Sequence, residues 1–250
     1  RLSRLISPFG NQGVGFNIEI VADEFPDYAG ELGNPYFDSA PYRLMVHYEG
    51  NDRANINFNG KKESLTWPGP GNLSCGPVDF SLHAFDLEMD ALKKVGPLQN
   101  VRAWLREWSG ISVYRDGFRV LPYGEPDDDW LRLDSRRVNN PVVRLSNNQI
   151  VGVCAITADN NPGLTDQTNR LGLNHSREFE DFRKLVLWIM GILEERRQKI
   201  RNPRNGSVNP EPAQSLHSVE SIVGQLREQA PNIPKKAGFA LGQSLDVLER

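Results

Sequence analysis

Cysteine is scarce in this sequence, which has only Cys75 and Cys154 among its 250 residues. Cys75 lies in a stretch rich in glycine and proline, and Cys154 lies in an apolar run. Such isolated cysteines do not indicate the disulfide framework of a small secreted protein, so we expect a reducing compartment, the cytoplasm. Long apolar runs are missing as well, since none approaches the ~20 residues that a membrane-spanning helix needs. The first residues also lack the pattern of a secretory signal peptide, so we expect no membrane among the partners.

A strong excess of charge of either sign is also missing. Lysine and arginine number 29 against 32 aspartates and glutamates, which gives a formal net charge of -3. This balance argues against a protein dedicated to binding nucleic acid, although it leaves room for a local basic patch. Apolar material is plentiful, because 38% of the residues are hydrophobic, with 5 Trp, 11 Phe and 6 Tyr among them. That content is enough for a folded core and excludes wholesale disorder.

Ligand patterns for metal ions and phosphates are missing too. None of the four histidines has a second His or Cys at metal-ligand spacing. The aspartates at 127–129 could hold Mg²⁺, but adjacent carboxylates mostly point apart, so a solvated acidic loop is the favoured interpretation. Residues 10–15 fit the pattern G-x-x-G-x-G, yet a strand-like segment follows them instead of the helix that a phosphate-binding loop needs. We therefore expect no metal site and no phosphate loop.

Alternation of apolar and polar residues predicts several strands. The segments with this pattern are residues 16–20, 44–48, 56–58 and 78–84. Asp116-Gly117 separates two further alternating runs, and this dipeptide is a strong signal for a β-hairpin because both residues adopt positive φ readily. Residues 149–156 are almost continuously apolar, which is typical of a central strand.

Helical periodicity is clearest from Ser176 to Ile200, where apolar side chains repeat over ~25 residues, or ~37 Å of helix. Two shorter helices are expected before it, over residues 87–95, with Asp86 as the capping residue, and over residues 101–108. The basic end of the long helix could contact phosphates, although a solvated end that compensates the helix dipole is more typical. This basic run comprises Arg196, Arg197, Lys199, Arg201 and Arg204.

The order of these segments predicts an α+β domain over residues 1–200, a linker over residues 201–214 and a helical tail over residues 215–250. Prolines and a glycine between residues 202 and 212 are typical of a linker. Apolar residues at helical spacing continue after it to the end of the sequence. The chain begins with Arg1 rather than methionine and ends within that helical pattern, so we expect it to be a fragment of a longer protein.

Between residues 110 and 173 the sequence becomes distinctive. The runs concerned are GISVYRDGFRV at 110–120, PYG at 122–124, DDWL at 128–131, RLSNNQIVG at 144–152 and NPGLTDQTNRLGL at 161–173. They resemble the second, or transducer, domain of bacterial GHKL-type ATPases related to the ninety-kilodalton heat-shock chaperone, MutL and MORC proteins. The resemblance covers residues 2–193 and is strongest after Gly110, while LISPF at 5–9 is similar to the junction that follows the family's ATPase domain.

The resemblance implies an α+β fold in which a mixed sheet packs with helices and includes an unusual left-handed βαβ crossover. It also implies that the domain senses nucleotide in a preceding ATPase domain and moves in response. In the family a basic loop residue reaches the γ-phosphate, and Arg170 occupies the matching position, with Asn169 and Gln167 as weaker candidates that orient the loop. A guanidinium suits phosphate oxygens and transition-state charge, although an ordinary exposed loop arginine, or one in a packing salt bridge, fits the same position. Leu171 follows where bacterial relatives often carry glutamate, so an ion pair with that glutamate is absent.

The family's adenine- and Mg²⁺-binding motifs are missing, since no E-x-x-x-N helix leads into a D-x-G-x-G segment. We therefore expect this chain alone neither to bind ATP well nor to hydrolyse it. The parent is expected to be an ATPase that holds ATP and Mg²⁺ in its N-terminal domain and forms a homodimer. An alternative is a non-catalytic module that kept the fold and binds protein or nucleic acid. A free-standing metal-dependent hydrolase built on the aspartates at 127–129 is a third, disfavoured interpretation.

Overall fold

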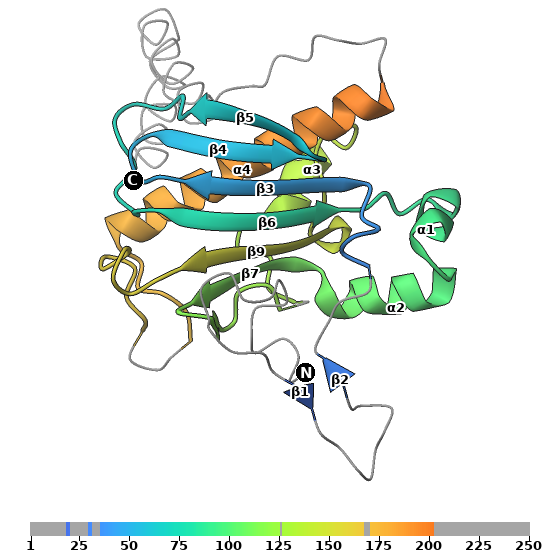
Figure 1. The fold of residues 1–250 in the computed structure, drawn as a ribbon, viewed down its shortest axis with the longest axis horizontal. Coiled ribbons are helices and arrows are strands. Elements are labelled where there is room, and N and C mark those ends of the chain that lie inside the picture. Colours follow the sequence, from blue (N-terminus) through green and yellow to red (C-terminus); the bar gives the residue numbers. More distant parts are fainter. Residues whose placement is uncertain (1–18, 21–29, 32–35, 126, 168–170, 203–250) are drawn as a thin grey trace, which may run out of the picture. The chain divides into compact units, whose positions relative to one another are not determined.

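Seven strands form one mixed sheet in the order β5-β4-β3-β6-β9-β7-β8 (Figure 1). The computed structural model describes residues 19–20, 30–31, 36–125, 127–167 and 171–202. Neighbouring strands of the sheet are antiparallel except β7 and β9, which are parallel. The seven strands are β3 (Tyr42–Tyr48), β4 (Arg53–Phe58), β5 (Lys61–Thr66), β6 (Val78–Ala84), β7 (Gly110–Arg115), β8 (Phe118–Val120) and β9 (Ile150–Ile156). Two further short strands, β1 (Glu19–Ile20) and β2 (Gly30–Glu31), form a separate antiparallel pair.

The alternation that predicted strands at 44–48 and 78–84 corresponds to the two faces of this sheet. Along β3 every second side chain is buried, and the register pairs Leu44 with Leu82 and Val46 with Phe80 of β6. Because paired residues point to the same face, these four side chains lie together in the main core. The intervening residues of β3 are exposed on the opposite face. The predicted strands and their buried faces are confirmed.

The long helix predicted from Ser176 onward is α4, Arg177–Arg201, which lies across one face of the sheet, behind it in Figure 1. Ser176 caps this helix, because its hydroxyl oxygen accepts the N–H of Phe179 at 3.2 Å. A buried stripe packs into the main core and consists of Phe182, Leu185, Val186, Ile189 and Leu193. Sheet and helices together confirm the predicted α+β class.

Two short helices follow β6 and lie beside the strand ends in Figure 1: α1, Met89–Val95, and α2, Leu98–Trp108. Trp104 of α2 contacts Phe37 and Phe85 edge to face, with ring centroids 5.7 and 5.6 Å apart. These residues belong to a second, smaller core cluster. No helix in the described ranges combines the length and the apolar character that spanning a membrane requires.

The parallel strands β7 and β9 are joined by a connection that contains β8 and α3, Leu133–Asn139. The helix α3 lies on the same side of the sheet as α4, and Arg136 of α3 forms an ion pair with Glu194 of α4 at 3.4 Å. In Figure 1 both strands run to the left, β9 lies above β7, and α3 lies behind the sheet. A chain that follows this route turns in the left-handed sense, whereas nearly all connections between parallel strands are right-handed.

One expected helix cap is wrong. Helix α1 begins at Met89, and the residue at its N-cap position is Glu88 rather than Asp86. The carboxylate of Asp86 instead accepts hydrogen bonds from Arg197 and Arg201. These arginines lie at the end of α4, so the role of Asp86 depends on tertiary structure and not on its local sequence.

The hairpins of the sheet were only partly predicted. Asp116-Gly117 forms the expected turn between β7 and β8, with φ of 51° and 84°. Strand β5 was not predicted, because its side chains other than Leu65 are exposed and give no apolar alternation. Its turn signal is nevertheless present, since Asn59 and Gly60 precede it with φ of 48° and 90°.

The chain divides into two compact units, residues 1–208 and 209–250. All described residues belong to the first unit. Most of the predicted linker and all of the predicted helical tail lie outside the described residues, as does most of the strand predicted at 16–20. These expectations stay predictions.

Candidate functional site

The loop between β9 and α4 carries the residues that the resemblance assigns to nucleotide sensing. Its two sides pair at a narrow base, where Asp166 forms an isolated antiparallel bridge with Leu173. The N–H of Gln167 donates across this base at 2.9 Å, and its side-chain Nε2 donates to the carbonyl of Leu173 at 3.2 Å. Arg170 and Asn169 lie outside the described residues, so the roles predicted for them stay predictions.

Several elements fix the base of this loop. The N–H of Leu173 donates to the hydroxyl of Tyr123 at 3.0 Å. Arg115 of β7 lies 3.4 Å from the carboxylate of Asp166. At the start of the loop, the buried side chain of Asn161 donates to two carbonyls of the segment before β6, at 2.6 and 2.8 Å. The loop base is therefore attached to β7, to the segment after β8 and to the segment before β6.

The runs that carry the resemblance also contact one another around β7. Gly124 packs so closely on this strand that a Cβ there would lie 2.4 Å from Oγ of Ser112. Trp130 donates from its indole nitrogen to the carbonyl of Ile111 at 2.9 Å. Segments that are separate in sequence thus form one structural neighbourhood beside the β9–α4 loop.

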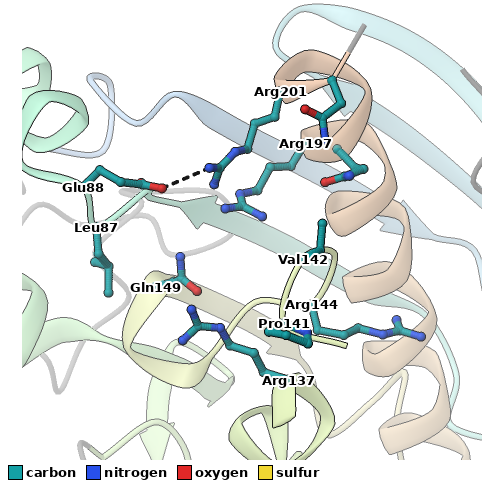
Figure 2. Close-up of a pocket in the computed structure, with 11 residues that line it drawn as sticks. Leu87, Glu88, Arg137, Pro141, Val142, Arg144, Gln149, Arg197 and Arg201 are labelled. Carbon is teal, nitrogen blue, oxygen red and sulfur yellow. Dashed lines mark hydrogen bonds and ion pairs between the residues drawn. The ribbon is translucent and has the colours of Figure 1, made fainter. Parts of the chain in front are cut away.

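A second candidate site is a cleft with a volume of about 530 Å³, whose surrounding side chains appear in Figure 2. Four of its lining residues are arginines, which come from α3, the segment after it and the last turns of α4. We call it the arginine-lined cleft. Its lining consists of Leu87, Glu88, Arg137, Pro141, Val142, Arg144, Gln149, Arg197, Gln198, Arg201 and Asn202.

Asp86, which precedes the lining residue Leu87, binds two of these arginines. Its Oδ1 accepts hydrogen bonds from Nε and Nη2 of Arg197 at 2.9 and 2.5 Å, and from Nη1 of Arg201 at 3.0 Å. Its Oδ2 accepts the hydroxyl of Tyr42 at 2.8 Å. Burial of this hydroxyl and its hydrogen bond to Asp86 raise the pKa of Tyr42 to about 12. The Arg197 side chain is only 4% exposed, so its charge depends on Asp86 for compensation.

Glu194 of α4 is a second buried carboxylate, with a side chain that is 1% exposed. Its Oε2 accepts hydrogen bonds from Arg144 at 2.7 Å and from Arg136 at 3.4 Å. Its Oε1 accepts the N–H of Leu145 at 3.0 Å. Desolvation lowers the pKa of Arg136 below its ordinary value, although the neighbouring Glu194 charge opposes this shift. The buried carboxylate is thus fully bonded, as its cost of desolvation requires.

Arg137 differs from the other arginines of the cleft. Its Nη1 donates to the hydroxyl of Ser146 at 3.2 Å, and within the described ranges no ion pair joins it to a carboxylate. Its Nε is buried and has no hydrogen-bond partner in the described part of the chain. In Figure 2 its guanidinium points toward Gln149, and those of Arg197 and Arg201 lie on the other side of Gln149, whereas Arg144 turns toward α4.

The sequence indicated the part of this cleft that α4 contributes, but not the part that α3 and the following segment contribute. The basic run at the end of the long helix contributes Arg197 and Arg201 to the lining. Arg137 and Arg144 come from a segment without clear apolar periodicity, so no local signal indicated that they join these residues. Their proximity depends on the packing of α3 and the following segment against α4.

The acidic run at 127–129 is less solvated than expected. Asp129 accepts the backbone N–H groups of Leu133 and Asp134 at 2.8 and 2.9 Å, so it holds the start of α3. Burial raises the pKa of Asp128, and the neighbouring Asp129 charge adds to this effect. Among the residues that the structure describes, no three His, Cys, Asp or Glu side chains are grouped as a metal site would require.

No family model, curated protein or solved structure matches this chain. Its function is therefore inferred from its own residues and from the geometry of the β9–α4 loop and the arginine-lined cleft.

Proposed function

We propose that this chain is the nucleotide-sensing transducer segment of a GHKL-type ATPase. In this proposal the parent protein binds ATP and Mg²⁺ in a preceding N-terminal domain, and this segment couples binding and hydrolysis there to a change of conformation. The parent acts as a homodimer. The observation that carries the proposal is the anchoring of the β9–α4 loop, in which the matched arginine, Arg170, follows the fixed base residue Gln167 by three positions.

The hand of the β7–β9 connection supports the same proposal. Left-handed connections between parallel strands are rare, and the resemblance includes one. The matched sequence runs also hold the loop, because Tyr123 binds Leu173 and Asn161 binds the segment before β6. A sensor loop needs this kind of support, since a charged group must be placed accurately to stabilise a transferring phosphoryl group.

The proposed chemistry assigns a limited role to this chain. The guanidinium of Arg170 contacts the γ-phosphate oxygens and stabilises the negative charge that builds up on them during hydrolysis. Gln167 keeps the loop closed through its bond to the Leu173 carbonyl, and Asn169 helps to orient the loop. ATP and Mg²⁺ are held by the preceding domain, so this chain alone is not an ATPase.

ATP turnover by the full-length parent tests the proposal directly. Replacement of Arg170 by alanine is expected to lower the turnover on the order of 10³-fold, because a γ-phosphate arginine contributes about that much. Arg170→Lys keeps the charge but loses the planar fork, so it should recover only part of the rate. Arg177→Ala is the matched control, since Arg177 is an exposed arginine at the start of α4 and should leave turnover unchanged. Normal turnover by Arg170→Ala would show that Arg170 is the wrong residue.

A second candidate is a non-catalytic module that kept the fold and binds protein or nucleic acid. The arginine-lined cleft favours it, because a concave basic surface can bind an anionic partner without ATP. The segment upstream in the parent distinguishes the two candidates. A folded parent that neither binds nor hydrolyses ATP, and lacks an upstream E-x-x-x-N helix, would favour the binding module.

A further inference from the structure

The arginine-lined cleft has more positive charge around it than its carboxylates balance. Five arginines surround or adjoin the cleft, the four that line it and Arg136 behind Glu194. Four carboxylates act on them: Asp86, Glu88, Glu194, and Asp129, whose charge acts on Arg136. One positive charge is therefore unbalanced within this group. Crowding arginines in a partly desolvated site is unfavourable unless an anion offsets their repulsion.

Arg137 has donor capacity that the protein does not use. A guanidinium presents five N–H donors in a planar fork, and the described contacts of Arg137 include one hydrogen bond, from Nη1 to Ser146. Its Nε is buried and has no hydrogen-bond partner among the described residues. A phosphate or carboxylate group matches such a fork with two parallel hydrogen bonds.

The orientation of the side chains gives this site two opposing sides. Figure 2 shows the Arg137 guanidinium on one side of Gln149 and those of Arg197 and Arg201 on the other. Arg197 and Arg201 are already bound to Asp86, and Arg201 also binds Glu88 at 3.0 Å. The Arg201 side chain is 37% exposed, so it is the more accessible of the two to a ligand. A single anion between the two sides would meet donors from both.

The size and lining of the cleft favour a ligand larger than a bare inorganic anion. A volume of about 530 Å³ lies in the range of small-molecule sites. Three apolar residues line it beside the arginines: Leu87, Pro141 and Val142. Val142 is 66% exposed, which leaves an apolar surface available to the organic part of a ligand.

We propose that the arginine-lined cleft binds a small phosphate ester, with the phosphate held between Arg137 and Arg201 and the organic part against Leu87, Pro141 and Val142. A phosphate monoester is negatively charged near pH 7, so it offsets the excess positive charge of the cleft. It also gives an acceptor to the guanidinium of Arg137, whose described contacts include a single hydrogen bond, to Ser146. This site shares no residue with the base of the β9–α4 loop, and it needs no preceding ATPase domain.

Isothermal titration calorimetry on the full chain tests the proposal at low and at physiological salt. The probes are inorganic phosphate, glucose 6-phosphate and AMP, with glucose and adenosine as partners that lack the phosphate. Saturable binding of one phosphate ester per chain is expected, tighter than inorganic phosphate and undetectable for the compounds without phosphate. Arg137→Gln should weaken it at least tenfold, and Arg201→Gln severalfold. Arg177→Gln is the control, because it removes one exposed arginine at the opposite end of α4, ~36 Å along the helix.

Each outcome of this titration supports or overturns the proposal. Binding that Arg137→Gln loses and Arg177→Gln keeps supports it, provided that urea unfolding shows both variants folded. If Arg137→Gln does not fold, the exposed site at Arg201 decides, since Arg201→Gln must then weaken binding and Arg177→Gln must not. Absence of binding, or equal binding by all variants, overturns it. Preference for a single-stranded oligonucleotide or an acidic peptide over every small ester also overturns it, in favour of a macromolecular surface. None of these results depends on ATP turnover by the parent, so the two proposals fail independently.

Discussion

The carboxylate of Asp86 holds more of the fold together than its position before α1 suggests. It accepts hydrogen bonds from Tyr42 of β3 and from Arg197 and Arg201 of α4. Arg197 has no other ion-pair partner among the described residues. The variant Asp86→Asn keeps the size of the side chain but removes its charge, so the guanidinium of Arg197 stays buried without compensation.

The structure sets the expected size of this effect. Removing one partner of a buried ion pair typically costs about 3–5 kcal/mol. The Asp86 side chain is 13% exposed and that of Arg197 is 4% exposed, so the pair counts as buried. The asparagine oxygen still accepts one hydrogen bond, which places the expected loss near the lower limit, about 3 kcal/mol. For a chain of this size, that loss lowers the melting temperature by roughly 6–12 °C.

Urea unfolding followed by tryptophan fluorescence measures this loss. Asp90→Asn is the matched control, because Asp90 lies in the adjacent helix α1 with a 92% exposed side chain, and it should change stability by less than about 0.5 kcal/mol. The double variant Asp86→Asn with Arg197→Met should recover part of the loss, since it removes the uncompensated charge. A loss below about 1 kcal/mol for Asp86→Asn, or no recovery in the double variant, would refute the reasoning.

Two further predictions concern stability. Burial of His83, with a smaller contribution from the nearby Arg43 charge, lowers its pKa from 6.5 to about 4. The unfolded chain therefore binds the proton first as pH falls. The stability that this histidine contributes is complete above about pH 6.5 and falls by about 3 kcal/mol toward pH 4. Urea unfolding at several pH values measures this dependence of stability on pH, and His83→Gln should flatten it. Gly124→Ala should lower the free energy of unfolding clearly more than Gly71→Ala in the same assay. Both glycines have positive φ, 73° and 69°, but a Cβ at Gly124 would lie 2.4 Å from Ser112, whereas a Cβ at Gly71 would have no atom within 4 Å. Strain alone accounts for about 1–2 kcal/mol, so equal losses would contradict the crowding argument.

Local patterns predicted the elements whose one face is buried. Strands β3 and β6 and helix α4 have apolar residues at the spacing that their own geometry requires, so their existence follows from the sequence. The turn at Asp116-Gly117 also follows from local chemistry, because both residues have positive φ. The α+β class could be predicted from these elements alone.

Elements without such a face could not be predicted in the same way. Strand β5 lies at the sheet edge and exposes all its side chains but Leu65, so no alternation identifies it. Helix α3 is only seven residues long and is held by Asp129 rather than by an apolar stripe. Asp86 was misassigned as a helix cap because its partners Arg197 and Arg201 are more than a hundred residues away. Local propensity carries no information about such contacts.

The two candidate sites differ in the same way, because one consists of a continuous run of sequence and the other of distant segments. The β9–α4 loop could be singled out because its residues form one continuous run, although Arg170 itself lies outside the described residues. The arginine-lined cleft could not, because its residues come from three separate segments: residues 87–88, 137–149 and 197–202. The sequence indicated only the basic run of α4 and favoured a solvated helix end for it. That interpretation fits Arg196 and Lys199 better than Arg197, whose side chain is buried.

The two candidate sites lie at opposite ends of α4. The helix begins at Arg177, just after the loop base at Leu173, and its last turns, ~30–36 Å along the helix, line the arginine-lined cleft. Between these ends the helix is fixed by its buried stripe and by the ion pairs of Glu194. Sliding α4 along the sheet by one turn, ~5.4 Å, would break the Glu194 and Asp86 bonds together, which is costly for buried charges. A force applied at the loop is therefore expected to move helix and sheet as one rigid body, as the proposed nucleotide-sensing role requires.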